Sequence, residues 1–291
     1  MLFEPLGPAA LENPIVDIAR LGMRVCSRRL PERFSKFHNK LYSPRQLMTI
    51  LLLKVYLKQT YRGVIHVLEI TPTLVQTLGL TDLPRHQTLH EFMKREVTAA
   101  LLADLMGELA KLLKESGVTL DEVAVDSTGL ANSKASAHFI SRRGTKATHY
   151  TKLSVAVACG LLIATGAVAS QGPGNDLVEA RPVLWQLSGN AHPRLLYADK
   201  GYDAEWVHAF CRYGMGTFSY IPPVPKTTDG TIKTMLRGLM TRLPKSYGRR
   251  WHAESFFSAL KRMFGDKLSA LSQAMREREA LLKALTYSLH R

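Results

Sequence analysis

The hydrophobic pattern of this chain changes near Gly117. Before this residue, apolar side chains recur every three or four positions, which is typical of helices that bury one face. After it, short apolar runs rich in Val, Ile and Leu alternate with helical stretches, which favours a sheet covered by helices. The pattern therefore predicts an all-α domain over residues 1–117 and an α/β domain over residues 118–291.

Local start and stop signals support the helices of the first domain. Ser43 and Pro44 form a helix-start signal, a cap residue followed by proline in the first turn. Gly117 closes an amphipathic stretch in the way that glycine commonly ends a helix. The predicted helices of this domain cover residues 43–58, 61–68, 72–80, 85–94 and 98–116.

The second domain opens with a β pattern, in which Val123 and Val125 alternate with polar neighbours before an expected Ser-Thr-Gly turn at 127–129. Further strands are predicted at 194–199 and 217–221, and residues 224–246 form a basic loop. The predicted helices of this domain cover residues 175–188, 203–213, 249–264 and 275–290.

A long uncharged stretch lies between Lys152 and Asp176. It is too short and too interrupted by glycine for a good membrane-spanning helix, and it divides at Cys159-Gly160 into two β-rich halves. We therefore expect a buried β-hairpin here and no membrane association.

Two aspartates end predicted strands of the second domain. Asp126 follows the first strand, and Asp199 ends the strand RLLYAD. Carboxylates at the carboxyl ends of strands in an α/β sheet face the crevice where ligands usually bind. Asp after a strand is also a common turn or helix-cap residue, so each position alone has a structural alternative.

A polar stripe follows on the segment 247–264. Tyr247, Arg250, Glu254 and Lys261 are separated by intervals of 3, 4 and 7, so in a helix they share one narrow arc beside an apolar face. A solvated Arg250–Glu254 pair, worth only a few tenths of a kcal/mol, is the structural alternative. That alternative leaves the two strand-ending aspartates unexplained.

Together these motifs resemble the DDE transposases of bacterial insertion sequences. The stretches AVDSTGL, LLYADKGYDA and the Y-R-E-K spacing match the family's first, second and third carboxylate motifs, and residues 41–96 resemble its helical front region less specifically. The resemblance implies an α/β RNase H-like catalytic domain, a mixed sheet flanked by helices, with an all-α N-terminal domain. It also implies that Asp126, Asp199 and Glu254 are the catalytic and metal-binding residues.

The chemistry of these side chains agrees with the resemblance. Phosphodiester cleavage needs an activated oxygen nucleophile and a stabilised leaving oxygen, and two divalent ions can supply both. Hard cations take carboxylate oxygens, so three acids can hold two Mg²⁺ ions, with Mn²⁺ as a substitute. In the family, the tyrosine, arginine and lysine of the signature contact phosphates, which implies that role for Tyr247, Arg250 and Lys261. Arg249 and Arg262 flank them and are expected to make general backbone contacts.

The charge of the chain indicates a polyanionic partner. Lys and Arg number 39 against 24 Asp and Glu, a net charge of +15. We expect phosphate contacts from a basic loop containing Arg142, Arg143, Lys146 and Lys152. A helix-turn-helix-like face is expected to bind DNA through His86, Gln87, His90, Lys94 and Arg95. A plain solvated face is an equal alternative for that helix, and the two histidines lack the glutamate of a zinc-protease motif.

The resemblance implies a DNA transposase that binds terminal inverted repeats, exposes 3′-OH groups at the element ends and joins them to target DNA as a homodimer or larger assembly. An RNase H-like nuclease without strand transfer and a non-catalytic, transposase-derived DNA-binding protein are the alternatives. The cysteines are few and scattered, and the first residues lack a signal-peptide pattern, so we expect a cytoplasmic, nucleoid-associated protein.

Overall fold

The structure is a computed structural model of the 291-residue chain, and it describes residues 13–33, 41–132, 150–225 and 230–291. The chain divides into two compact units, residues 1–93 with His290 and residues 94–289 with Arg291. Helix α6 (Ala99–Glu115) belongs to the second unit, where it packs against strand β3 and helix α8. The sheet unit thus includes a helix that precedes the change of pattern at Gly117, because the apolar face of α6 covers part of the sheet.

The described part of the first unit is all helical, as expected. Among its helices, α2 begins with a capping box, in which Ser43 Oγ accepts from the Gln46 N–H at 3.2 Å and Gln46 Oε1 accepts from the Ser43 N–H at 2.8 Å. The helices of this unit are α1 (Pro14–Arg29), α2 (Pro44–Tyr56), α3 (Tyr61–Glu69), α4 (Pro72–Thr77) and most of α5 (His86–Arg95). Helix α1 was not predicted, although the Asn13 side chain caps it.

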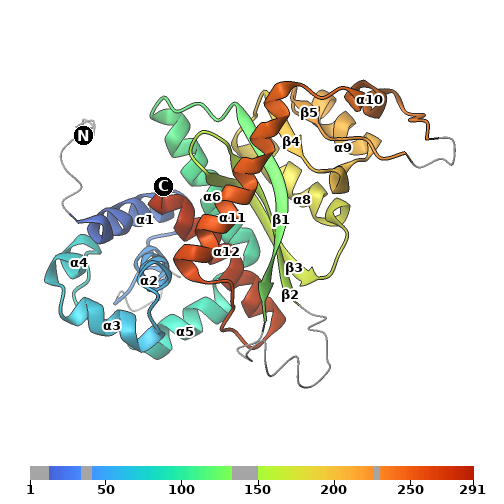
Figure 1. Cartoon of the computed structure of the whole chain (residues 1–291). Helices are drawn as coiled ribbons and strands as arrows, with labels where there is room; N and C mark the ends of the chain where they lie inside the picture. The colour runs from blue at the N-terminus through green and yellow to red at the C-terminus, as the bar shows by residue number, and fades with distance from the viewer. Residues whose placement is uncertain (1–12, 34–40, 133–149, 226–229) are drawn as a thin grey trace, which may run out of the picture. The chain divides into compact units, whose positions relative to one another are not determined.

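The second unit contains a five-stranded mixed sheet with the order β3-β2-β1-β4-β5 (Figure 1). Strands β1, β2 and β3 are antiparallel neighbours, while β4 and β5 run parallel to β1. The strands are β1 (Glu122–Ala131), β2 (Tyr150–Ala158), β3 (Ile163–Gly172), β4 (Leu195–Ala198) and β5 (Phe218–Tyr220). The predicted RNase H-like architecture, a mixed sheet flanked by helices, is confirmed. The uncharged stretch forms the β2–β3 hairpin, and no helix in the described part of the chain is long and apolar enough to cross a bilayer.

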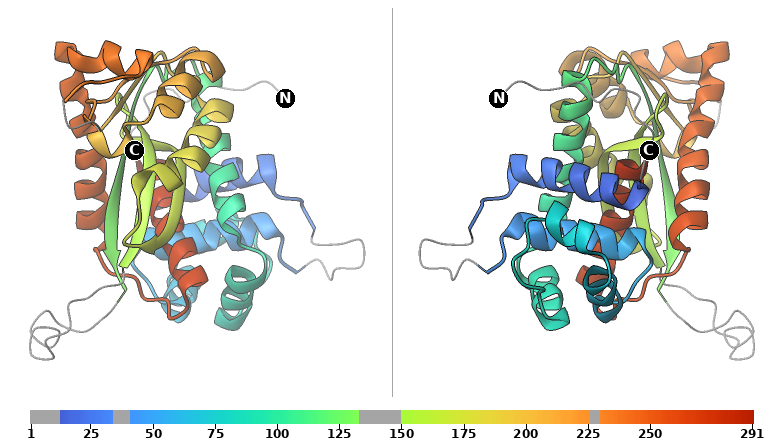
Figure 2. Two further views of the ribbon diagram at one scale, coloured as in Figure 1. Left: turned by 90° about the vertical axis from the view of Figure 1, so that its right-hand side faces the viewer. Right: turned by 90° about the vertical axis from the view of Figure 1, so that its left-hand side faces the viewer.

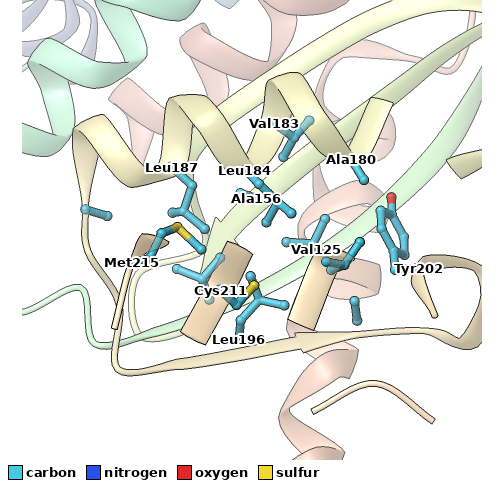
Figure 3. Packing of buried hydrophobic residues seen from close by; sticks show 14 of the residues in the cluster. Val125, Ala156, Ala180, Val183, Leu184, Leu187, Leu196, Tyr202, Cys211 and Met215 are labelled. Carbon is cyan, nitrogen blue, oxygen red and sulfur yellow. The ribbon is translucent and has the colours of Figure 1, made fainter. Parts of the chain in front are cut away.

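Helices cover both faces of the sheet. Helix α11 (Trp251–Phe264) packs on β1 and β2 from one side, and α6 and α8 (Asp176–Asn190) lie on the other (Figure 2). Other helical elements of this unit are α9 (Glu205–Ala209), η2 (Phe210–Gly214), α12 (Gln273–His290) and the short turn η1 (Lys200–Tyr202). On the α8 side, Val183, Leu184 and Leu187 pack onto Val125 and Ala156 of the sheet (Figure 3).

Two local predictions are wrong. Residues 127–129 do not turn; β1 continues to Ala131, because antiparallel pairing with β2 extends through the register Ala131↔Tyr150. Residues 224–246 are not a continuous loop, since they contain α10 (Met235–Gly238), η3 (Leu239–Thr241) and the start of η4 (Lys245–Arg250).

A buried ion pair fixes α10 to the preceding elements. Arg237 is 6% exposed and donates to both carboxylate oxygens of Asp203, at 2.8 and 2.6 Å, and to the Val224 carbonyl at 2.6 Å. Burial alone would raise the pKa of Asp203, but the hydrogen bonds from Arg237 and from the Val224 N–H outweigh it and lower the pKa. The pair therefore stabilises the ionised carboxylate.

We expect Arg237→Met to lower the free energy of unfolding by about 3–5 kcal/mol, because Asp203 is left buried without its cation. The matched control, Arg242→Met at an exposed position, should change it by less than about 0.5 kcal/mol. Since the pKa of Asp203 is lowered on folding, its contribution is present above about pH 4 and lost as the pH falls further. Urea unfolding at pH 7 and pH 3 measures both effects; equal stability of the two variants at pH 7 would contradict the assignment.

Candidate active site

The register of two parallel strands places Asp126 beside Asp199. The β1–β4 pairing ends at Val125↔Ala198; Asp126 is the next residue of β1, and Asp199 directly follows β4. Because parallel strands in register direct corresponding side chains to the same face, the two carboxylates lie together on one side of the sheet. Asp126 is within β1 and not at its end, since β1 continues in its antiparallel pairing with β2.

The Asp126 side chain is largely enclosed, with 19% of its surface exposed. Its Oδ1 accepts from the Ser127 N–H at 2.8 Å, and its Oδ2 lies 3.3 Å from Arg250 Nη1. Burial raises the pKa of Asp126; the Ser127 N–H and the charge of Arg250 oppose the rise, and the charges of Asp199 and Glu254 add to it. The three acids of the predicted triad therefore lie close enough for their charges to interact.

Asp199 caps a short helix and also lies close to the other acids of the candidate site. Its Oδ1 accepts from the Gly201 N–H at 2.7 Å, so it caps the short helix η1. Its charge also raises the pKa of Asp126 and of Tyr247, which places it among the residues of the candidate site. A capping role and membership of an acidic cluster are thus compatible at this position.

Glu254 lies in the first turn of α11, and Arg250 connects it to Asp126. Arg250 Nη2 donates to Glu254 Oε1 while Nη1 faces Asp126, so one guanidinium bridges two of the three acids. The Glu254 side chain is 57% exposed against 26% for Arg250. The site is therefore closed toward the sheet and open to solvent on the α11 side.

The polar stripe is built differently from the single helix that the sequence predicted. Tyr247 and Arg250 lie on the 3₁₀ helix η4, and α11 begins only at Trp251. Tyr247 still reaches the site, because its hydroxyl donates to the Ala198 carbonyl at 3.1 Å, one residue before Asp199. Burial raises the pKa of Tyr247. The charge of Arg250 opposes this rise, and the charges of Asp199 and Asp126 add to it.

The donor set has the chemistry of a divalent-cation site. Three carboxylates that repel one another are the oxygen ligands that Mg²⁺ takes. In the described residues, however, no three acidic, histidine or cysteine side chains are arranged as a preformed metal site. The guanidinium of Arg250 contacts one oxygen of Asp126 and one of Glu254, so the three acids fit a divalent cation in the chemistry of their oxygen atoms, while two of them share a protein cation.

The structure places the predicted DNA contacts of the second domain differently from one another. The expected phosphate contact of Lys152 is wrong. The residue is 4% exposed and is paired with Asp176 and Glu179 at 2.9 and 2.6 Å, so its ammonium group is not available to a phosphate. Arg249 pairs with Glu122 on β1, while Lys261 and Arg262 lie further along α11, where Arg262 is exposed. The other residues of the basic loop, Arg142, Arg143 and Lys146, lie outside the described residues.

The predicted DNA-facing helix is formed as α5, and most of the named side chains point to solvent. Its buried residues are Leu89, Phe92 and Met93, and His86 is half-buried. The exposed members of the predicted set are Gln87, His90, Lys94 and Arg95. Their exposure is what both a DNA-binding face and a solvated face require, so DNA contact stays a prediction here.

Sequence reasoning missed the partners of Lys152, which are Asp176, Glu179 and the Gly174 carbonyl, and it missed the contact of Asp176 with Ser127. Asp176 and Glu179 lie in the first turn of α8, and Ser127 Oγ donates to Asp176 Oδ1 at 2.8 Å. The available signal was the position of Asp176 as the first charge after the uncharged stretch, directly following its cap residue Asn175.

Comparison with known proteins places the sheet unit in a family. A family model described as the transposase DDE domain matches residues 119–289, which is more than half of the chain and includes all three acids. Among curated proteins, no match to the chain is found.

We expect the carboxyl group of Asp126 in the metal-free protein to titrate above the ordinary range for aspartate, and Arg250→Gln to move its midpoint to still higher pH. The reason is that burial raises this pKa and the Arg250 charge opposes the rise. Carboxyl ¹³C NMR of aspartate-labelled protein measures the midpoint, and the spectrum of Asp126→Asn identifies the resonance. A midpoint unchanged by Arg250→Gln would show that the guanidinium does not contact Asp126 in solution.

Proposed function

The chain belongs to the DDE transposase family, and we propose that it is the transposase of a bacterial insertion sequence with the Y-R-E-K signature. In this proposal it binds the terminal inverted repeats of its element, cleaves the ends to give 3′-OH groups and joins them to target DNA. The observation that carries the proposal is the adjacency of Asp126 and Asp199 on neighbouring parallel strands, with Glu254 joined to Asp126 through Arg250.

Asp126, Asp199 and Glu254 are the proposed holders of two Mg²⁺ ions, which Mn²⁺ can replace. Bound there, such ions supply activation of the attacking oxygen and stabilisation of the leaving oxygen. Among these proposed holders, Asp126 is the enclosed member and Glu254 is the solvent-exposed member. The Ser127 and Gly201 N–H groups orient one oxygen of Asp126 and of Asp199, so the backbone sets the direction of both carboxylates.

Arg250 has two proposed roles, one before DNA binds and one after. In the free protein it neutralises Asp126 and Glu254 as their shared counter-ion. With DNA bound, its planar fork is suited to a bidentate contact with the phosphate at the cleaved end. Tyr247 is proposed to orient that phosphate, and Lys261 to contact a neighbouring phosphate as a point charge. Arg249 and Arg262 are proposed as general backbone contacts.

The proposed DNA-binding domain is the helical front region, through the exposed face of α5. The net charge of +15 supports a large electrostatic contribution to binding. Joining two element ends in concert requires two active sites, so we propose a homodimer or larger homo-oligomer on DNA.

We expect Glu254→Gln to lower the rate of end cleavage and of strand joining by on the order of 10³-fold or more, because several kcal/mol of metal-derived charge stabilisation is lost. Labelled element ends and a supercoiled target, incubated with Mg²⁺, Mn²⁺ or EDTA, report both steps. DNA binding and thermal stability should stay near those of the wild type, since Glu254 is more than half exposed.

The matched control is Glu277→Gln, the same chemical change on α12. Full activity in Glu254→Gln, or a loss of DNA binding together with activity, would contradict the catalytic assignment. Metal-dependent cleavage without joining in the wild type would favour an RNase H-like nuclease. Binding to ends with neither reaction would favour a non-catalytic DNA-binding protein.

We expect Lys94→Ala and Arg95→Ala each to weaken binding to the element ends and to reduce the slope of log affinity against log salt by about 0.9 for each lost phosphate contact. Lys111→Ala is the control, because Lys111 is exposed on α6 and paired with Glu108. Fluorescence anisotropy over a range of salt concentrations measures the slope. An unchanged slope in both variants would assign α5 to a plain solvated face.

A further inference from the structure

Lys152 is the centre of a buried charged cluster on the side of the sheet opposite to Asp126. Ser127, Ser154 and Ser170 direct their hydroxyls to this side, where α8 begins, while Asp126 faces α11. Burial would lower the pKa of Lys152, but its bonds to Asp176 and Glu179 outweigh this and raise it. The lysine is thus held as a cation between two acids, and we name Lys152, Asp176 and Glu179 the lysine brace.

Glu179 anchors the brace to the hairpin. It is 5% exposed, and besides Lys152 its oxygens accept from Ser170 Oγ at 2.6 Å and face Ser154 Oγ at 3.4 Å. Lys152 also donates to the Gly174 carbonyl at 2.9 Å, just before α8. Because both oxygens of Glu179 are engaged by β2 and β3, this end of the brace is fixed to the most extensively paired part of the sheet.

Asp176 connects the brace to the strand that carries Asp126. Its Oδ1 accepts from Lys152 Nζ at 2.9 Å and from Ser127 Oγ at 2.8 Å. Ser127 is the next residue after Asp126, and its N–H donates to Asp126 Oδ1. A shift of Asp176 would therefore move both the backbone and the amide that orient Asp126.

The other oxygen of Asp176 reaches the turn that carries Asp199. A methyl group added at Gly201 would lie 2.7 Å from Asp176 Oδ2 and 2.9 Å from Asp199 Oδ1, so the two acids enclose this glycine. Burial raises the pKa of the adjacent Tyr202, and the charges of Asp176, Asp126 and Asp199 add to the effect. Asp176 thus lies close to both aspartate segments while facing them from the far side of the sheet.

We propose that Asp176, held in place by Lys152 and Glu179, is a positioning residue of the active site that sets the relative placement of Asp126 and Asp199 through Ser127 and Gly201. The expected effect of Asp176 on turnover rests on the proposed function. Its expected effect on the backbone at Ser127 and Gly201 does not. Asp176 acts through other residues and needs no contact with DNA.

The test is Asp176→Asn in the full-length protein, because asparagine keeps an acceptor for Ser127 but removes the charge. We expect kcat for end cleavage to fall about 10–100-fold with little change in KM for DNA, as for other residues that orient a site from behind. Amide hydrogen exchange at Ser127 and Gly201, measured by NMR without metal or DNA, should become about tenfold faster. Gly201→Ala should reproduce the loss of kcat, because its methyl group displaces the same acids.

The control is Asp203→Asn, which also removes a buried, ion-paired acid from the same unit. It should lower thermal stability while leaving kcat, measured well below its Tm, and exchange at Ser127 and Gly201 near wild type. If Asp176→Asn fails to fold, Ser127→Ala takes its place, since it removes only the link to β1 and should give the same loss of kcat.

The outcomes separate this inference from the proposed function. A wild type that cuts no ends would refute the proposed function, while the exchange measurement would still decide whether the lysine brace holds the two segments. Wild-type exchange rates at both amides in Asp176→Asn would overturn the inference. So would a wild-type kcat in that variant or, where it does not fold, in Ser127→Ala.

Discussion

The short parallel pairing between β1 and β4 is the constraint on which the candidate site depends. Its last pair, Val125↔Ala198, brings two aspartates that are far apart in sequence to adjacent positions on one face of the sheet. Antiparallel pairing with β2 holds β1 rigid on both sides of Asp126, and α11 packs over the same face with Glu254 in its first turn. The hydrophobic core between α8 and the sheet keeps these strands in register, so packing in the interior determines the geometry of the surface acids.

Placing three acids together is electrostatically unfavourable, and the charge of Arg250 opposes this at Asp126, while a second cation, Lys152, neutralises a separate pair of acids. On the open side, Arg250 bridges Asp126 and Glu254. On the enclosed side, Lys152 is the buried cation paired with Asp176 and Glu179. The Arg250 arrangement is partly exposed to solvent, whereas the Lys152 arrangement is buried.

The fold class predicted from the sequence is confirmed, and the three predicted acids lie close together, because strand ends, helix caps and the tyrosine-to-lysine spacing are local signals. Prediction from the sequence failed where partners far along the chain decide the outcome. Residues 127–129 have turn composition, but pairing with β2 keeps them in a strand. Lys152 follows a basic stretch with the composition of a loop, but it is buried because it pairs with Asp176 and Glu179. The start of α11 was misplaced because a 3₁₀ helix and an α-helix have nearly the same local pattern over one turn.

The most direct test of this account asks where the protein binds a divalent ion. Fe²⁺ can replace Mg²⁺ or Mn²⁺ at an oxygen site, and with ascorbate and peroxide it cuts the backbone near the bound ion. Mass spectrometry of the fragments from the protein bound to element-end DNA then maps the site. We expect cuts grouped near residues 126, 199 and 254, and these cuts should disappear in Asp126→Asn. Cuts grouped elsewhere, or a pattern unchanged by that substitution, would contradict a shared metal site formed by these three acids.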